Sequence, residues 1–314
     1  TAVMLFGMAL LVGAARSIEL TAIGASLSQA DPPMQIVILL GMIFLLAGIG
    51  FKISVVPFHA WAPDVYEGAP TPVTAFLTVA PKALGFAVMA RVLFVAFPLF
   101  TLKWAALLTW ISILTMTFGN VIAISQSNVK RLLAYSSIAQ AGYILVGFGV
   151  PGKLGLEAAL IYIAAYLFTN LGAFFAVLAV EHATGSNQLE AYNGLSRRSP
   201  LLALALALFL LSLAGIPPLA GFIGKIYIFS AAVKARSIPL AIAIALNSAV
   251  AAYYYFKVVK AMYLTPPARG EKFENPLPIK IAVSVTLAGV FLIGLWPQSI
   301  IRIVEQSLVT LPRF

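Results

Sequence analysis

Long apolar runs, separated by short polar or proline-rich breaks, constrain the fold of this chain more than any other feature of its sequence. An α-helix needs roughly 20 apolar residues to cross a hydrocarbon layer about 30 Å thick. Nine runs approach or exceed this length: Ala2–Leu20, Met34–Phe58, Pro72–Phe97, Lys103–Ser125, Val129–Val150, Leu156–Glu181, Pro200–Val233, Ile238–Leu264 and Leu277–Trp296. They predict an all-α, polytopic membrane protein with about nine transmembrane helices. Only 10% of the 314 residues are charged, which is too few to cover a soluble globule of this size.

Basic residues between these runs carry most of the charge, and the formal net charge is +10. Basic residues at the ends of apolar runs suit anionic lipid head groups and the control of topology, so we expect membrane lipid as a partner and no nucleic acid. One set of connections carries Lys130, Arg131, Arg197, Arg198, Arg269, Lys272 and Lys280, and the other carries Arg16, Lys103, Lys153, Lys234 and Arg236. The positive-inside rule predicts that the first set is cytoplasmic.

The chain offers few ligands for a metal or a redox centre. It has no cysteine, which excludes thiolate-held iron–sulfur clusters and disulfides within it. Its two histidines, His59 and His182, are too few and too far apart to indicate a haem or metal site, and we expect them in loops or at helix ends.

Two of the runs are interrupted by proline, and each carries one lysine near the interruption. The string GIPP at 215–218 divides the seventh run and precedes Lys225, while Lys52 precedes Pro57 in the second run. Proline removes a backbone donor and clashes with the preceding turn, so we expect both helices to be broken in mid-membrane. Broken backbone at that depth is tolerated only where it is buried in protein or lines a wet cavity. Four runs separate the two breaks, which predicts a five-span repeat in opposite orientations.

Lys52, Lys82 and Lys225 are the candidate functional residues, because we place all three inside the hydrocarbon layer. Lys82 lies ten residues into its run, which corresponds to roughly 15 Å of helix. A charge at that depth costs at least about 2.5–3.5 kcal/mol, so a function is the default hypothesis. Lysine suits proton transfer because loss of water favours its neutral form and a nearby carboxylate favours its charged form. None of the ten carboxylates falls in mid-span, which disfavours a purely structural ion pair within this chain.

Polar side chains at similar depth could complete a proton path, or could join helices by hydrogen bonds. They are Tyr135, Ser136, Ser137 and Gln140 in the fifth run, Tyr162, Tyr166, Thr169 and Asn170 in the sixth, and Asn247, Ser248, Tyr253, Tyr254 and Tyr255 in the eighth. For any single one of them the hydrogen-bonding role is the simpler interpretation. Gly142, Gly147 and Gly172 are expected at close contacts between helices.

Four strings resemble a known family. They are VPFHAWAPDVYEGAPTPVTAF at 56–76, QSNVKRLLAYSSIAQAGY at 126–143, AYLFTNLGAF at 165–174 and SLAGIPPLAGFIGK at 212–225. They are similar to the antiporter-like membrane subunits of respiratory complex I, and most similar to the N-type subunit of bacterial NADH-quinone oxidoreductase. Pro81, where photosynthetic relatives usually carry serine, favours a bacterial respiratory complex.

The resemblance implies a proton-translocating subunit driven by redox chemistry in other subunits. It implies fourteen spans, so the nine expected here would be the sixth to the fourteenth. Lys52 would match the lysine of the discontinuous seventh helix, Lys82 the connecting lysine of the eighth and Lys225 the lysine of the discontinuous twelfth. A glutamate that pairs with Lys52 would then lie upstream of Thr1.

The same resemblance sets the expected organisation and partners. Residues 1–97 would end the first inverted repeat, 103–264 would form the second, and 277–314 would form the final span and an amphipathic tail, all within one transmembrane domain in the bacterial inner membrane. The partners would be other membrane subunits, including further antiporter-like ones. No cofactor is expected in this chain, since NADH, flavin, iron–sulfur clusters and quinone would bind to other subunits. Two alternatives stay open: a subunit of a sodium/proton antiporter, and a membrane scaffold without conduction.

Overall fold

The computed structural model describes residues 1–267 and 272–309, and all the regular elements in this part of the chain are helical. The first half contains α1 (Ala2–Ala15), α2 (Leu20–Gln29), α3 (Pro32–Ile53), α4 (Trp61–Gly68), α5 (Thr71–Arg91), η1 (Val92–Ala96), η2 (Pro98–Phe100), α6 (Thr101–Ile124) and α7 (Val129–Gly149). The second half contains α8 (Lys153–Thr184), η3 (Leu189–Tyr192), α9 (Leu195–Arg198), α10 (Pro200–Ala214), α11 (Ala220–Lys234), α12 (Ile238–Leu264), α13 (Leu277–Leu295) and α14 (Gln298–Val309). The prediction of an all-α fold is confirmed. Arg269 and the tail residues 310–314 lie outside the described residues.

The expected count of nine spans is not confirmed. In the described part of the chain, seven helices are long and apolar enough to cross a membrane, or eight if the bent pair α1 and α2 is one span. The expected first span, Ala2–Leu20, is wrong as a single helix. Helix α1 ends at Ala15, where Arg16 adopts a left-handed backbone conformation with φ 51°. The axis of α2 is bent by 60° from that of α1. The expected span Pro200–Val233 is two helices, α10 and α11, of 15 residues each.

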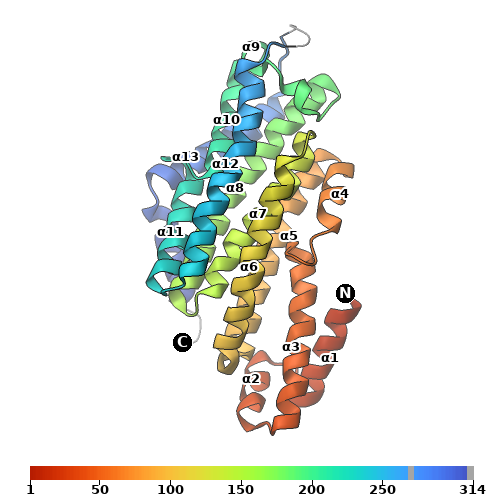
Figure 1. Cartoon of the computed structure of the whole chain (residues 1–314), viewed down its shortest axis with the longest axis vertical. Helices are drawn as coiled ribbons and strands as arrows, with labels where there is room; N and C mark the ends of the chain where they lie inside the picture. Colours follow the sequence, from red (N-terminus) through yellow and green to blue (C-terminus); the bar gives the residue numbers. More distant parts are fainter. Residues whose placement is uncertain (268–271, 310–314) are drawn as a thin grey trace.

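The long helices form an elongated bundle with α7 near its centre, and α1 lies beside α3 at one edge (Figure 1). In the apolar 18-residue stretch of α7, 89% of the residues are buried within the protein, against 28% in that of α13. Close approach of α6 to α7 explains part of this burial, since a Cβ on Gly142 would lie 2.6 Å from the backbone nitrogen of Met116. Helix α7 therefore carries its polar side chains into the protein interior, away from lipid.

The tail helix α14 rests on the bundle through one face. It packs against α8 and buries Val304 and Leu308, while Arg302 and Glu305 are exposed. This is the amphipathic pattern expected from the sequence. Its position at the membrane interface stays a prediction.

Candidate functional site

The second half of the molecule contains a helix break that holds Lys225. Helix α10 ends at Ala214, and Gly215 follows with φ 89°, a left-handed conformation that glycine adopts without strain. The amide of Ile216 returns to the carbonyl of Leu211 at 3.0 Å, which closes the end of the helix as a Schellman-type cap. Helix α11 begins at Ala220. We call residues 215–219 the α10/α11 break.

Lys225 projects back from α11 onto this break. Its Nζ donates to the carbonyl of Ala214 at 2.8 Å and lies 4.8 Å from the ring centre of Tyr143. Its relative exposure is 7%. Carbonyls at a helix C-terminus lack intrahelical donors and carry partial negative charge, so the break creates an acceptor for the ammonium. Among the described residues, no carboxylate forms a salt bridge with Lys225.

The first half contains a second break with the same cap. Helix α3 ends at Ile53, Ser54 adopts φ 59°, and the amide of Val55 returns to the carbonyl of Gly50 at 3.0 Å. The indole of Trp61 at the start of α4 donates to the carbonyl of Phe51 at 3.0 Å. We call residues 54–60 the α3/α4 break. Both breaks expected from proline are therefore present.

Lys52 lies in the last turn of α3 but points away from the bundle interior. It is exposed on this chain and lines a groove of about 320 Å³, whose other walls come from α1 and α5. No hydrogen bond or ion pair of Lys52 is found within residues 1–267 and 272–309. The groove surface is mostly apolar. The described residues therefore supply no partner for the Lys52 ammonium.

Lys82 is the most enclosed of the three lysines, with a relative exposure of 1%. It stands in the middle of α5, and its Nζ contacts the carbonyl of Ser137 at 2.7 Å and the Oγ of the same residue at 2.5 Å. The ring of Tyr66 on α4 lies 5.8 Å from Nζ. All the contacts of its ammonium found in the structure are with neutral groups. Lys82 thus joins α5 to the central helix α7.

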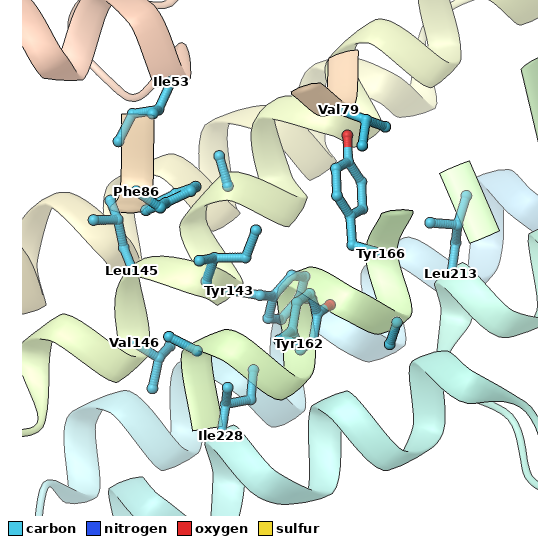
Figure 2. Packing of buried hydrophobic residues seen from close by; sticks show 14 of the residues in the cluster. Ile53, Val79, Phe86, Tyr143, Leu145, Val146, Tyr162, Tyr166, Leu213 and Ile228 are labelled. Carbon is cyan, nitrogen blue, oxygen red and sulfur yellow. The ribbon is translucent and has the colours of Figure 1, made fainter. Parts of the chain in front are cut away.

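A chain of polar groups leads from Lys82 into the second half of the molecule. The Tyr166 hydroxyl of α8 lies near Ser137 and donates to the carbonyl of Thr78 at 3.0 Å. Figure 2 shows the ring of Tyr166 standing with its hydroxyl toward Val79 of α5, while Tyr143 and Tyr162 lie together. Tyr143 and Tyr162 stack at 6.0 Å between ring centres. Because Lys225 lies over Tyr143, the aromatic pair continues toward the second buried lysine.

A small cavity lies among the polar side chains of the interior. Its volume is about 10 Å³, and its polar lining comes from α7, α8 and α10: Gln140, Tyr162, Tyr166, Thr169 and Ser212. Helix α11 contributes Gly221 to its wall. A space of this size suits about one water molecule when two or more polar groups face it. The cavity is walled by both halves of the broken helix that carries Lys225.

Gln140 connects this cavity to a second hydrogen-bonded network. Its Oε1 accepts from the Tyr162 hydroxyl at 2.5 Å, and its Nε2 donates to the Tyr255 hydroxyl at 3.2 Å. The Tyr255 hydroxyl also meets the Ser136 Oγ at 2.5 Å. Among the other polar residues expected from sequence, Asn247 and Tyr254 bind Asn120 instead, and Tyr253 faces outward with an exposure of 64%.

Several groups that surround the lysines could not be found from the sequence. Tyr66 lies in what reads as a loop, Tyr143 reads as an ordinary aromatic residue, and the Ala214 carbonyl is backbone. Lys130, counted above as a charge of a loop, is 3% exposed and donates to the carbonyl of Ala69. The sequence offered one signal for the burial of Lys130: it stands next to Arg131 in the first turn of a helix.

Comparisons with known proteins place these features in one family. The family model described as NADH:quinone oxidoreductase/Mrp antiporter, TM, matches residues 1–251. NADH-quinone oxidoreductase subunit N of Moorella thermoacetica is 46% identical over 99% of this chain and 65% of its own length. NAD(P)H-quinone oxidoreductase subunit 2 of Thermosynechococcus vestitus is 42% identical over 100% of this chain and 62% of its own. The chain thus spans somewhat less than two thirds of these relatives.

Solved structures show the same fold. A chain of respiratory complex I from Thermus thermophilus superposes with a TM-score of 0.80 at 35% identity, covering 96% of this chain and 65% of that one. A chain of the Mrp complex from Dietzia sp. superposes with a TM-score of 0.90 over 99% of this chain and 65% of that one, at 21% identity, which supports the fold alone. From its matches in sequence and structure, the chain belongs to the NADH:quinone oxidoreductase/Mrp antiporter transmembrane family and is a multi-pass membrane protein.

Proposed function

We propose that this chain is part of a proton-translocating membrane subunit of a bacterial NADH:quinone oxidoreductase, located in the inner membrane beside other membrane subunits. Lys82 and Lys225, two lysines without carboxylate partners in the described interior, carry the proposal, together with nearby polar groups and the small cavity that some of them line. An uncompensated ammonium in the interior is unfavourable, so each lysine holds a proton only while its surroundings permit it. Such groups suit stepwise proton transfer.

In the proposed path the proton enters at Lys52, passes to Lys82 and leaves through Lys225. The Ser137 hydroxyl accepts the proton of Lys82 while it releases its own, and the proposal requires a water in the small cavity to carry that proton on toward Lys225. Gln140 and Tyr162, which are hydrogen-bonded to each other, also line that cavity. The carboxylate that pairs with Lys52 comes from elsewhere in the full-length protein or from another subunit. NADH, flavin, iron–sulfur clusters and quinone bind to other subunits, whose redox chemistry drives the relay.

A sodium/proton antiporter subunit is the other function this fold supports. The relatives named as quinone oxidoreductase subunits share 41–46% identity with this chain, whereas the Mrp structure shares 21%. The sequence therefore favours the oxidoreductase. Sodium-dependent proton flux in membranes without NADH and quinone would support the antiporter instead.

The test uses the full-length subunit in its membrane complex, in inverted vesicles. Lys82→Met and Lys225→Met keep the length of the side chain and remove the exchangeable proton. We expect each to slow proton transfer through this subunit by ~10²-fold or more, with a matching fall in the yield of protons per NADH oxidised. Lys153→Met, at the exposed start of α8, is the matched control and should leave the yield unchanged. A normal proton yield in both interior variants would remove the relay from the mechanism.

A further inference from the structure

A groove at one end of the bundle is independent of the lysine relay. It has a volume of about 650 Å³ and lies between the N-terminal halves of α10 and α13. Its walls are mostly apolar and include Leu204 and Ala205 of α10 and Ile279, Val283 and Leu287 of α13. Cavities of roughly 300–1,000 Å³ hold ligands of small-molecule size.

The mouth of this groove is basic. Arg198, Lys272 and Lys280 line it, and we call these three residues the basic mouth. Lys280 pairs with Glu274 at 3.4 Å, with both side chains exposed. Among the described residues, Arg198 and Lys272 form no ion pair. The lining residues therefore carry three cationic groups and one carboxylate.

Arg198 is held in place at the mouth of the groove by contacts with Ala191 and Phe273. Its Nη1 donates to the carbonyl of Ala191 at 3.0 Å, and its guanidinium lies 5.2 Å from the ring centre of Phe273. Its Nε is buried without a hydrogen-bond partner in the structure. A stacked and partly fixed guanidinium loses little freedom when it binds an anion, and its remaining donors match a phosphate group.

Two helix N-termini add to the positive potential at the same place. Helix α10 begins at Pro200 and α13 at Leu277, and neither has a side-chain cap. The first backbone amides of a helix lack intrahelical partners and carry partial positive charge. From this mouth both helices run into apolar segments, and α13 is long enough to span a membrane. The mouth thus lies at a helix end, where head groups meet a membrane-spanning helix.

We propose that this groove binds an anionic phospholipid, with its phosphodiester at the basic mouth and an acyl chain along the apolar walls of α10 and α13. Clustered basic residues beside membrane-spanning helices attract anionic lipids. A free phosphate ion would leave the apolar walls uncovered, and a zwitterionic lipid would leave the excess positive charge uncompensated. The combination of charge and shape therefore selects one class of ligand.

The test uses the full-length protein in its complex, purified in detergent and stripped of lipid. Phosphatidylglycerol, phosphatidylcholine or inorganic phosphate is added, and the midpoint of heat denaturation is measured. We expect phosphatidylglycerol to raise the midpoint by several degrees, and the double variant Arg198→Gln/Lys272→Gln to lose most of that rise. The control variant Lys153→Gln/Lys234→Gln changes the first residue of α8 and the last residue of α11. It should keep the rise in the midpoint. An equal rise with phosphatidylcholine, a full rise with phosphate alone, or an unaltered response of the first double variant would overturn the proposal.

A second measurement leaves the basic mouth intact. Leu204 is 50% exposed on the groove wall, so a photo-crosslinking residue there samples whatever occupies the groove in native membranes. Crosslinks to anionic lipid would support the proposal. Crosslinks to another polypeptide would show that the groove is a subunit contact and would overturn it.

Discussion

At both broken helices the chain stops with a residue in the left-handed region and returns the next amide to the carbonyl five residues back. The α3/α4 break uses Ser54 and Val55, and the α10/α11 break uses Gly215 and Ile216. The lysines differ in position, since Lys52 precedes its break and Lys225 follows. They also differ in surroundings, because Lys225 folds back over Gly215 into the interior while Lys52 faces an open groove.

The difference shows that each helix break exposes a backbone carbonyl as a hydrogen-bond acceptor. The packing of neighbouring helices determines which side chain donates to that carbonyl. At the α10/α11 break the Ala214 carbonyl accepts from Lys225. At the α3/α4 break the Phe51 carbonyl accepts from the Trp61 indole, so the backbone is satisfied without the lysine. Lys52 is therefore available to a partner from outside the described residues, whereas Lys225 already has its contacts within this chain.

Exchanging the left-handed residues should give the largest effect. Serine at position 215 would hold φ near 89° and place its Cβ about 2.6 Å from the Cδ of Lys225. We expect Gly215→Ser to destabilise the protein by about 2 kcal/mol or more, since left-handed strain alone costs roughly 1–2 kcal/mol. Ser54→Gly relieves strain at φ 59° and should change stability by less than about 1 kcal/mol.

The measurement for this exchange is the midpoint of heat denaturation, together with the proton yield in vesicles. Gly215→Ser should lower both quantities, because the ammonium of Lys225 moves with its aliphatic chain. Equal and small effects of the two substitutions would mean that the breaks respond alike despite their different surroundings.

Removing the indole donor at the α3/α4 break should have a smaller effect. Trp61→Phe keeps a ring to stack on Phe51, whose centre lies 5.1 Å away, but loses the hydrogen bond to the Phe51 carbonyl. A lost hydrogen bond of this kind costs about 0.5–1.5 kcal/mol. Trp110→Phe, at a site with 63% exposure on α6, is the control and should have no effect on the denaturation midpoint. Identical midpoints for the two variants would contradict the role given to Trp61.

The sequence predicted the bounds of the helices well where a span is one uninterrupted apolar run. The expected run Ile238–Leu264 coincides with α12, and Val129–Val150 extends one residue beyond α7. Apolar length is a local property, so it can be read from consecutive residues. The interruption at Arg16 was missed because a bend of 60° depends on how α2 packs against η1, and that contact is absent from the pattern of the first run.

The sequence predicted burial of two of the three candidate lysines but not the groups that they contact, and the functional role of all three stays a prediction. Lys82 and Lys225 are buried as expected, while Lys52 is exposed on this chain, because the side of α3 on which it lies is not covered by the described helices. The partners of Lys82 come from Ser137 and Tyr66, and those of Lys225 from Ala214 and Tyr143. Contacts between residues so far apart along the chain follow from helix packing, which spacing within one run does not encode.

The helices that follow the two breaks, α4 and α11, are held by different contacts, and a last substitution tests the contacts of α4. Helix α11 is enclosed by α7, α8, α12 and α13, whereas α4 is tied to α7 through Arg131, whose Nη1 lies 2.8 Å from Asp64 and 2.6 Å from Glu67. Arg131→Gln should cost about 0.5–1 kcal/mol at low salt and less at high salt, because these groups are partly exposed and are screened. Lys280→Gln, which removes a more exposed pair, should leave the denaturation midpoint unchanged without added lipid. A salt-independent loss for Arg131→Gln would mean that packing of its side chain, and not its charge, holds α4 at the α3/α4 break.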